Sequence, residues 1–121
     1  MSKSTRQVKT TTYPYDRFYV IRRYQDKLME ESFFHAFVNT VDVDENGDML
    51  SECYGDECWE SFLELAVLFD DYAECKAVFD SLNFDDEIYS EYAIDMVVRK
   101  PNADNLSSNI VRMKTMHIRE V

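Results

Sequence analysis

Residues 42–48, Asp-Val-Asp-Glu-Asn-Gly-Asp, place side-chain oxygens at alternating positions, as a calcium ligand set would. An EF-hand loop uses oxygens at positions 1, 3 and 5, glycine at position 6 and a bidentate glutamate at position 12. The first half fits, but Cys53 occupies position 12. A plain acidic hairpin is therefore the prediction. The alternative is a divalent-metal (calcium) binding module whose ligands would be Asp42, Asp44, Asn46 and Asp48.

Other catalytic and metal-binding patterns are weak. A zinc site needs about four closely spaced Cys or His ligands, and a nucleophilic site needs a base beside its nucleophile. The two glycines of the chain cannot form a phosphate-binding loop. We therefore predict a protein that is not an enzyme and has no cofactor and no metal site. The cysteines and histidines considered are Cys53, Cys58, Cys75, His35 and His117.

Charge is the most informative feature of the sequence. The formal net charge is −11, but residues 42–95 hold eighteen Asp or Glu against one lysine, a net of −17. Residues 1–41 and 96–121 each carry a net +3. Aromatic and aliphatic residues are interleaved with the acids, which indicates a folded acidic surface and not a solvated tail.

The acids of residues 56–74 are predicted to form a partner-binding surface. Asp56, Glu60 and Glu64 are spaced i, i+4 and i+8, which would align them along one side of a helix. Helix capping explains some of the other acids, and a merely solubilising role is the other interpretation. The predicted partner-binding residues are Asp56, Glu57, Glu60, Glu64, Asp70, Asp71 and Glu74, with Asp44, Glu45 and Asp48 of the hairpin at the rim.

Direct nucleic-acid binding is not expected. Aromatic residues lie beside arginines in residues 17–24 and could form a base-stacking platform. A protein of net charge −11 repels a polyanion at long range, however, and phosphate contacts need local positive charge. These aromatic residues are predicted to be core.

The periodicity predicts an α+β fold with the order β-β-β-α-α-β-β. Strands are expected at 15–24, from about 36 onward, at 92–99 and at 110–119, with a tight turn at Asn46-Gly47. Residues 28–38 could be helix or strand. Apolar positions at helical spacing predict helices over 56–69 and from Asp71 to Asn83. The fold class is thus an antiparallel sheet of about five strands with two helices on one side.

Length and composition indicate one domain of residues 15–121, preceded by a flexible N-terminal arm of residues 1–14. No apolar run is long enough for a membrane span or a secretory signal. Three cysteines without such a signal indicate a reducing compartment, so a cytoplasmic location is expected, in the host if the protein is viral. Oligomeric state is left open.

By its size and its acidic block from Asp42 to Asp95, the chain resembles the small acidic inhibitors that phages carry against host restriction or CRISPR nucleases. Some of those inhibitors mimic DNA. They share no single fold, so no residue role is carried over. The resemblance implies a non-enzymatic protein that binds the basic surface of a nucleic-acid-binding partner by charge complementarity. A generic small protein-interaction adaptor is the other alternative.

Overall fold

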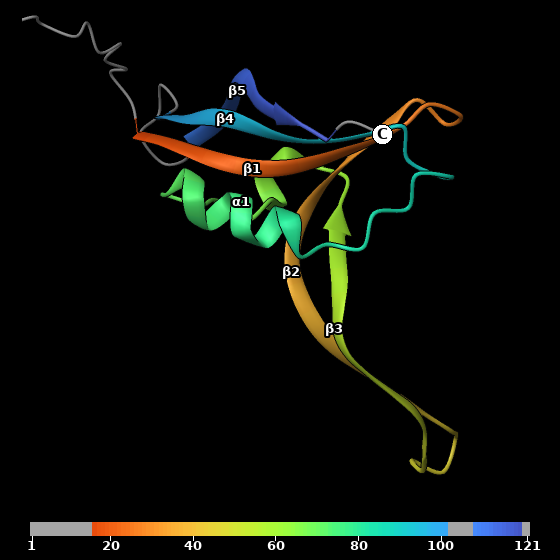
Figure 1. Cartoon of the computed structure of the whole chain (residues 1–121). Coiled ribbons are helices and arrows are strands. Elements are labelled where there is room, and N and C mark those ends of the chain that lie inside the picture. The colour runs from red at the N-terminus through yellow and green to blue at the C-terminus, as the bar shows by residue number, and fades with distance from the viewer. Residues whose placement is uncertain (1–15, 102–107, 120–121) are drawn as a thin grey trace, which may run out of the picture.

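The computed structural model describes residues 16–101 and 108–119; the predicted N-terminal arm, residues 1–14, lies outside them. Five strands, one 3₁₀ turn and one α-helix make up this part of the chain (Figure 1). Their bounds are β1 Asp16–Gln25, β2 Glu30–Val43, β3 Met49–Glu60, η1 Leu63–Leu65, α1 Tyr72–Asp80, β4 Glu91–Pro101 and β5 Ser108–Ile118.

The strands form one antiparallel sheet in the order β3-β2-β1-β4-β5. β1 is central, as its apolar residues on both faces predict, and it pairs with β4 over nine residues, from Asp16 to Tyr24. Its pairing with β2 covers four residues, from Arg22 to Gln25. β3 and β5 are therefore the two edges of the sheet.

Each face of the sheet buries its own apolar cluster, because successive strand residues point to opposite faces. On one face α1 packs Cys75 and Phe79 against Ile21 and Ile94. On the other face the η1 region packs Ala66 against Phe18, Val20, Phe33 and Val97. Both faces of β1 and β4 are thus covered.

The chain passes from one face to the other through a gap between β1 and β2. Beyond Phe33 the two strands separate, and residues 67–69 occupy the space. The amide of Val67 donates to the carbonyl oxygen of Phe34 at 3.0 Å. Tyr19 and Phe69 exchange two backbone hydrogen bonds, each 2.9 Å long. These bonds satisfy the backbone groups that the divergence of β2 would leave unpaired.

After the separation, β2 and β3 continue together as a two-stranded β-ribbon, defined here as residues 36–57, which projects away from the rest of the molecule (Figure 1). Its end is a tight turn in which Gly47 has φ +85°, as the Asn46-Gly47 pair predicts. Irregular pairing beside Asn39 and Asp42 marks β-bulges. Gly55, with φ +71°, lies at one of them and donates its amide to Asn39 Oδ1 at 3.0 Å.

The predicted fold class is wrong, because the described part of the chain is mostly β and has a single α-helix. Residues 56–60 end β3, and residues 61–69 hold the short η1 turn. Phe62 and Ala66, which flank η1, are extended, with ψ 134° and 145°. Of residues 28–38, where helix and strand were both open, residues 30–38 belong to β2, and residues 28 and 29 lie in the turn before it.

The other helix is confirmed. Asp71 is its N-cap, and its side chain accepts a hydrogen bond from the amide of Ala73 at 3.2 Å. The helix ends at Asp80, slightly before the predicted Asn83. β4 and β5 pair antiparallel, as predicted. No helix in the described ranges is long and apolar enough to cross a membrane.

Candidate interaction surface

The β-ribbon concentrates acidic side chains on an element that leaves the body of the protein. Its 22 residues contain seven Asp or Glu and no Lys or Arg, and no Lys or Arg occurs anywhere between residues 28 and 75. At about 3.3 Å per residue, the eight residues 36–43 of β2 extend roughly 26 Å. The acids of the ribbon are Asp42, Asp44, Glu45, Asp48, Glu52, Asp56 and Glu57.

The carboxylate of Asp44 shapes the turn. Its Oδ1 accepts from the amides of Asn46 and Asp48, each at 2.9 Å. Asp42 accepts from the hydroxyl of Ser51 at 2.8 Å. One oxygen of Asp42 and one of Asp44, two of the four residues in the calcium alternative, are thus engaged within the hairpin. Among the described residues, no group of three or more His, Cys, Asp or Glu could hold a metal ion.

The predicted helical row of acids is wrong, because the helix that would align it does not form. Asp56 and Glu60 lie on extended β3, and Glu64 lies in η1. Since η1 and α1 pack against opposite faces of the sheet, Glu64 and Glu74 belong to different sides of the molecule. Asp44, Glu45 and Asp48 lie at the far end of the ribbon, not at the rim of a helical surface.

Besides Asp44, other predicted partner-binding carboxylates have structural contacts. Glu57 accepts from the indole of Trp59 at 3.0 Å and from the amide of Asn83 at 2.7 Å, so it ties the chain after α1 to β3. Asp71 caps α1, and Asp70 and Glu74 lie beside that cap at the positive end of the helix. Exposed Glu45, Asp48 and Glu52 remain the ribbon acids best placed to meet a partner.

Most of the strand arginines are used inside the molecule. Arg22 is buried, and its guanidinium contacts both oxygens of fully buried Asp95, at 2.7 and 3.3 Å, and also pairs with Glu91. Burial alone would lower the pKa of Arg22, but the hydrogen bonds to Asp95 and Glu91 outweigh it and raise the pKa. Arg23 lies between the rings of Trp59 and Tyr89, 4.0 and 3.9 Å from their centroids.

A second arginine extends this network across the sheet. Arg112 donates to both oxygens of Glu31, at 2.7 and 3.1 Å, and to Asp95 at 3.3 Å. Thr115 donates to the other oxygen of Asp95 at 2.8 Å. The hydrogen bonds from Arg112 lower the pKa of Glu31. Arg22 and Arg112 therefore neutralise carboxylates that lie on the strands themselves.

The arginine ion pairs between residues of the described ranges lie on the body of the protein. They involve Glu31, Glu91 and Asp95, and Arg119 pairs with Asp86. Lys76, the single lysine of the acidic block, pairs with Asp80 one turn along α1. These pairs neutralise carboxylates of the body, whereas the ribbon adds seven carboxylates and no Lys or Arg.

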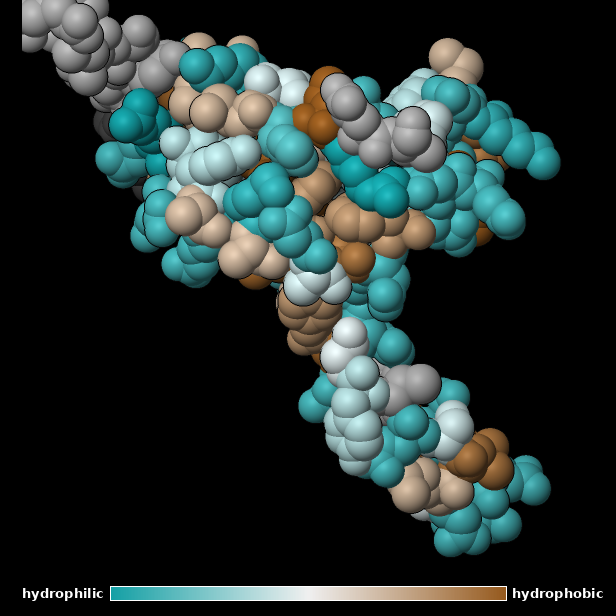
Figure 2. Space-filling model, viewed as in Figure 1, coloured by the Kyte–Doolittle hydropathy of each residue, from teal (hydrophilic) through white to brown (hydrophobic). Residues whose placement is uncertain are grey.

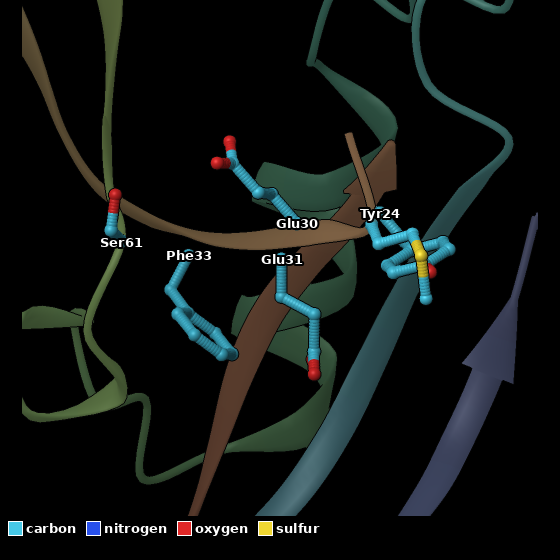
Figure 3. A pocket seen from close by; sticks show the side chains of 6 residues that line it. Tyr24, Glu30, Glu31, Phe33 and Ser61 are labelled. Carbon is cyan, nitrogen blue, oxygen red and sulfur yellow. The ribbon is translucent and has the colours of Figure 1, made fainter. Parts of the chain in front are cut away.

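A pocket of about 380 Å³ lies beside the β1–β2 turn (Figure 3). Figure 3 shows Glu30 pointing to one side of β2, with Glu31 and Phe33 pointing to the other. Acid–base catalysis by two carboxylates requires that they converge on one reacting group, and Glu31 is held by Arg112. The arrangement offers no such pair. The residues that line the pocket are Tyr24, Met29, Glu30, Glu31, Phe33 and Ser61.

Cys75 has the environment of a structural thiol. It is fully buried on α1, and burial raises its pKa from 9.0 to about 12. Because the folded-state pKa is the higher one, the neutral thiol contributes stability below about pH 9, and this contribution is lost as the pH rises toward 12.

We predict that iodoacetamide at about pH 8 will modify half-buried Cys58 well before Cys75 in the folded protein, because the reagent needs an accessible thiolate. Digestion with an endoprotease that cleaves at glutamate separates Cys58 from Cys75, and mass spectrometry of these peptides measures both reactions. In urea the two thiols should react at similar rates. Equal labelling of both in the native protein would contradict the packing of α1 on the sheet.

Comparison with known protein families, curated proteins and solved structures found no match to this chain.

The sequence reasoning missed the apolar residues of the ribbon. Val41 pairs with Glu52 and Val43 with Met49, so these side chains share a face, and both valines and Met49 are more than half exposed. Figure 2 shows hydrophobic residues among hydrophilic ones on this projection. The alternation Val-Asp-Val-Asp in residues 41–44 is the signal that could have found them.

Proposed function

We propose that the protein is a non-enzymatic, acidic binding protein that inhibits a basic, nucleic-acid-binding partner, such as a host defence nuclease of the CRISPR or restriction type. One observation carries the proposal, namely the projecting ribbon with seven carboxylates and no cationic side chain. An acidic projection can enter a channel that evolved to hold phosphates, because both present closely spaced negative charge to basic side chains.

The ribbon suits this role better than the helical surface suggested by sequence. A two-stranded ribbon is narrow enough for a nucleic-acid channel, since its strands are about 4.8 Å apart. Its turn is fixed by the hydrogen bonds of Asp44, so the acids at its end are held in order before binding. Preorganised charge loses less conformational entropy on association than a mobile acidic tail would lose.

The proposal predicts that reversing charge on the ribbon weakens binding more than the same reversal elsewhere. The test variant is Glu45→Lys, Asp48→Lys and Glu52→Lys, whose side chains are exposed. The matched control reverses three exposed acids of the body, Glu64, Asp70 and Glu87. Both variants change the net charge by the same amount, so long-range attraction is equally reduced.

Binding is measured against a panel of purified CRISPR effector complexes and restriction endonucleases at several salt concentrations, with DNA cleavage as the second readout. The ribbon variant should lose roughly tenfold or more in affinity, with a shallower salt dependence, while the body variant loses less. Equal losses would refute a specific role for the ribbon. If the panel shows neither binding nor inhibition, the proposed nuclease partner is wrong.

A further inference from the structure

The apolar stripe of the ribbon, defined here as Phe37, Val41, Val43 and Met49, begins beside the core of the protein and runs outward along the ribbon. Phe34 is buried and its ring contacts that of Phe37 at 4.9 Å between centroids. Phe37 is 46% exposed, and Val43 and Met49, farther out, are 55% and 60% exposed. Apolar side chains therefore continue outward from the core along the ribbon, where no other part of the described structure covers them.

An uncovered two-stranded ribbon has little stability of its own in water. Burial of the stripe would add roughly 25 cal/mol for each Å² of apolar surface removed from water. A partner that covers the ribbon would therefore stabilise it. A second ribbon cannot be the cover, because each carries seven carboxylates and no cation, and like charges at close range oppose contact.

The opposite edge of the same sheet has complementary properties. β5 contains no Asp or Glu. Of its two cations, Arg112 is held by Glu31 and Asp95, so Lys114 supplies the positive charge of this edge. Met113 and Met116, at the two bulges of this strand, are 43% and 38% exposed, and Lys114 between them is exposed. β5 thus offers apolar side chains and positive charge where the ribbon offers apolar side chains and negative charge.

The two surfaces do not meet within one molecule, because β3 and β5 are opposite edges of a five-stranded sheet. They can meet between two molecules. If one ribbon face is about 26 Å long and about 10 Å wide, a single contact buries about 260 Å² on each partner, or roughly 500 Å² in total. Two reciprocal contacts bury on the order of 1,000 Å², close to the lower limit for specific interfaces.

We propose that the chain forms a symmetric dimer in which the apolar stripe of each ribbon docks on β5 of the second copy. The acids along the ribbon then lie near Lys114 of the other molecule. This dimer is a separate proposal and does not depend on the proposed inhibition. A basic partner that takes the ribbon would compete with the second copy for the same surface.

The proposal predicts a concentration-dependent monomer–dimer equilibrium of the purified chain, measured by sedimentation equilibrium. The variant Val41→Thr, Val43→Thr keeps β-branched side chains and charge but weakens the apolar contact, so it should dimerise roughly tenfold or more weakly. The control variant Leu28→Thr, Ile88→Thr alters exposed apolar residues outside both surfaces and should dimerise like the wild type.

Mixing two defective variants gives a sharper test. Met113→Thr, Met116→Thr removes the β5 half of the contact but leaves the ribbon intact, and the valine variant does the opposite. Each alone should dimerise only weakly, whereas an equimolar mixture retains one complete contact and should form heterodimers at high concentration. Far-ultraviolet circular dichroism and thermal melts show whether each variant is folded.

A monomer at every concentration, or a dimer that both variants leave unchanged, would overturn the proposal. These results are independent of the nuclease panel. Failure of the dimer with intact inhibition would leave the proposed function standing. A dimer without any nuclease binding would remove the proposed function alone.

Discussion

Replacement of Arg22 by methionine is expected to lower the free energy of unfolding by about 3–5 kcal/mol, because it leaves a buried charge without its main partner. Asp95 is fully buried, and Arg22 contacts both of its oxygens. Methionine keeps the apolar stem of the side chain, so packing changes little. Urea denaturation at neutral pH measures the loss.

Two further variants separate charge from packing. Arg17→Met changes an exposed arginine of the same strand and should shift stability by about 0.5 kcal/mol or less. Adding Asp95→Asn to Arg22→Met removes the uncompensated charge while keeping the hydrogen bond from Thr115, so the double variant should regain part of the loss. If the double variant were no more stable than the single one, an unpaired carboxylate would not be the cause.

The local features of the fold were predictable, because they depend on a few adjacent residues. Asp71 caps α1 through an amide two residues away, and Asn46-Gly47 supplies the positive φ that a tight hairpin turn requires. Neither depends on which strands later become neighbours.

The helix predicted over 56–69 shows where periodicity misleads. The apolar spacing of this segment is real, but its residues serve two clusters on opposite faces of the sheet. Trp59 and Phe69 contribute to the face covered by α1, and Ala66 contributes to the other face. These residues reach both faces because the chain crosses the sheet through the gap between β1 and β2. That gap exists only once the sheet is assembled, so the sequence pattern does not reveal it.

Pairing between residues far apart in the chain also could not be predicted from the sequence. Asp95 within the apolar run Ile94–Val98 indicates a buried carboxylate that needs a partner. Its partner, Arg22, is 73 residues away and is chosen by the register of β1 on β4. The exposure of the ribbon has the same origin, because residues 67–69 take the place on β1 that β2 would otherwise occupy.

Replacement of Phe79 by alanine should lower the free energy of unfolding by about 3–5 kcal/mol, as much as Arg22→Met does. Phe79 is 1% exposed and packs its ring against Phe84 and His117, each 5.3 Å away between centroids. It holds α1 on the sheet, so its removal leaves a cavity between the helix and the sheet. Thermal and urea unfolding of the purified variant measure this loss.

Phe37→Ala is the matched comparison, because it deletes the same atoms from a side chain that is 46% exposed on the ribbon. In dilute solution, where the monomer dominates, it should cost about 1 kcal/mol, the order of one aromatic pair such as that with Phe34. At concentrations that favour the dimer, the cost should grow, because Phe37 lies on the stripe that the second copy covers. A cost equal to that of Phe79→Ala even in dilute solution would mean that the ribbon folds back onto the body, and that neither the inhibitor nor the dimer has a free ribbon to use.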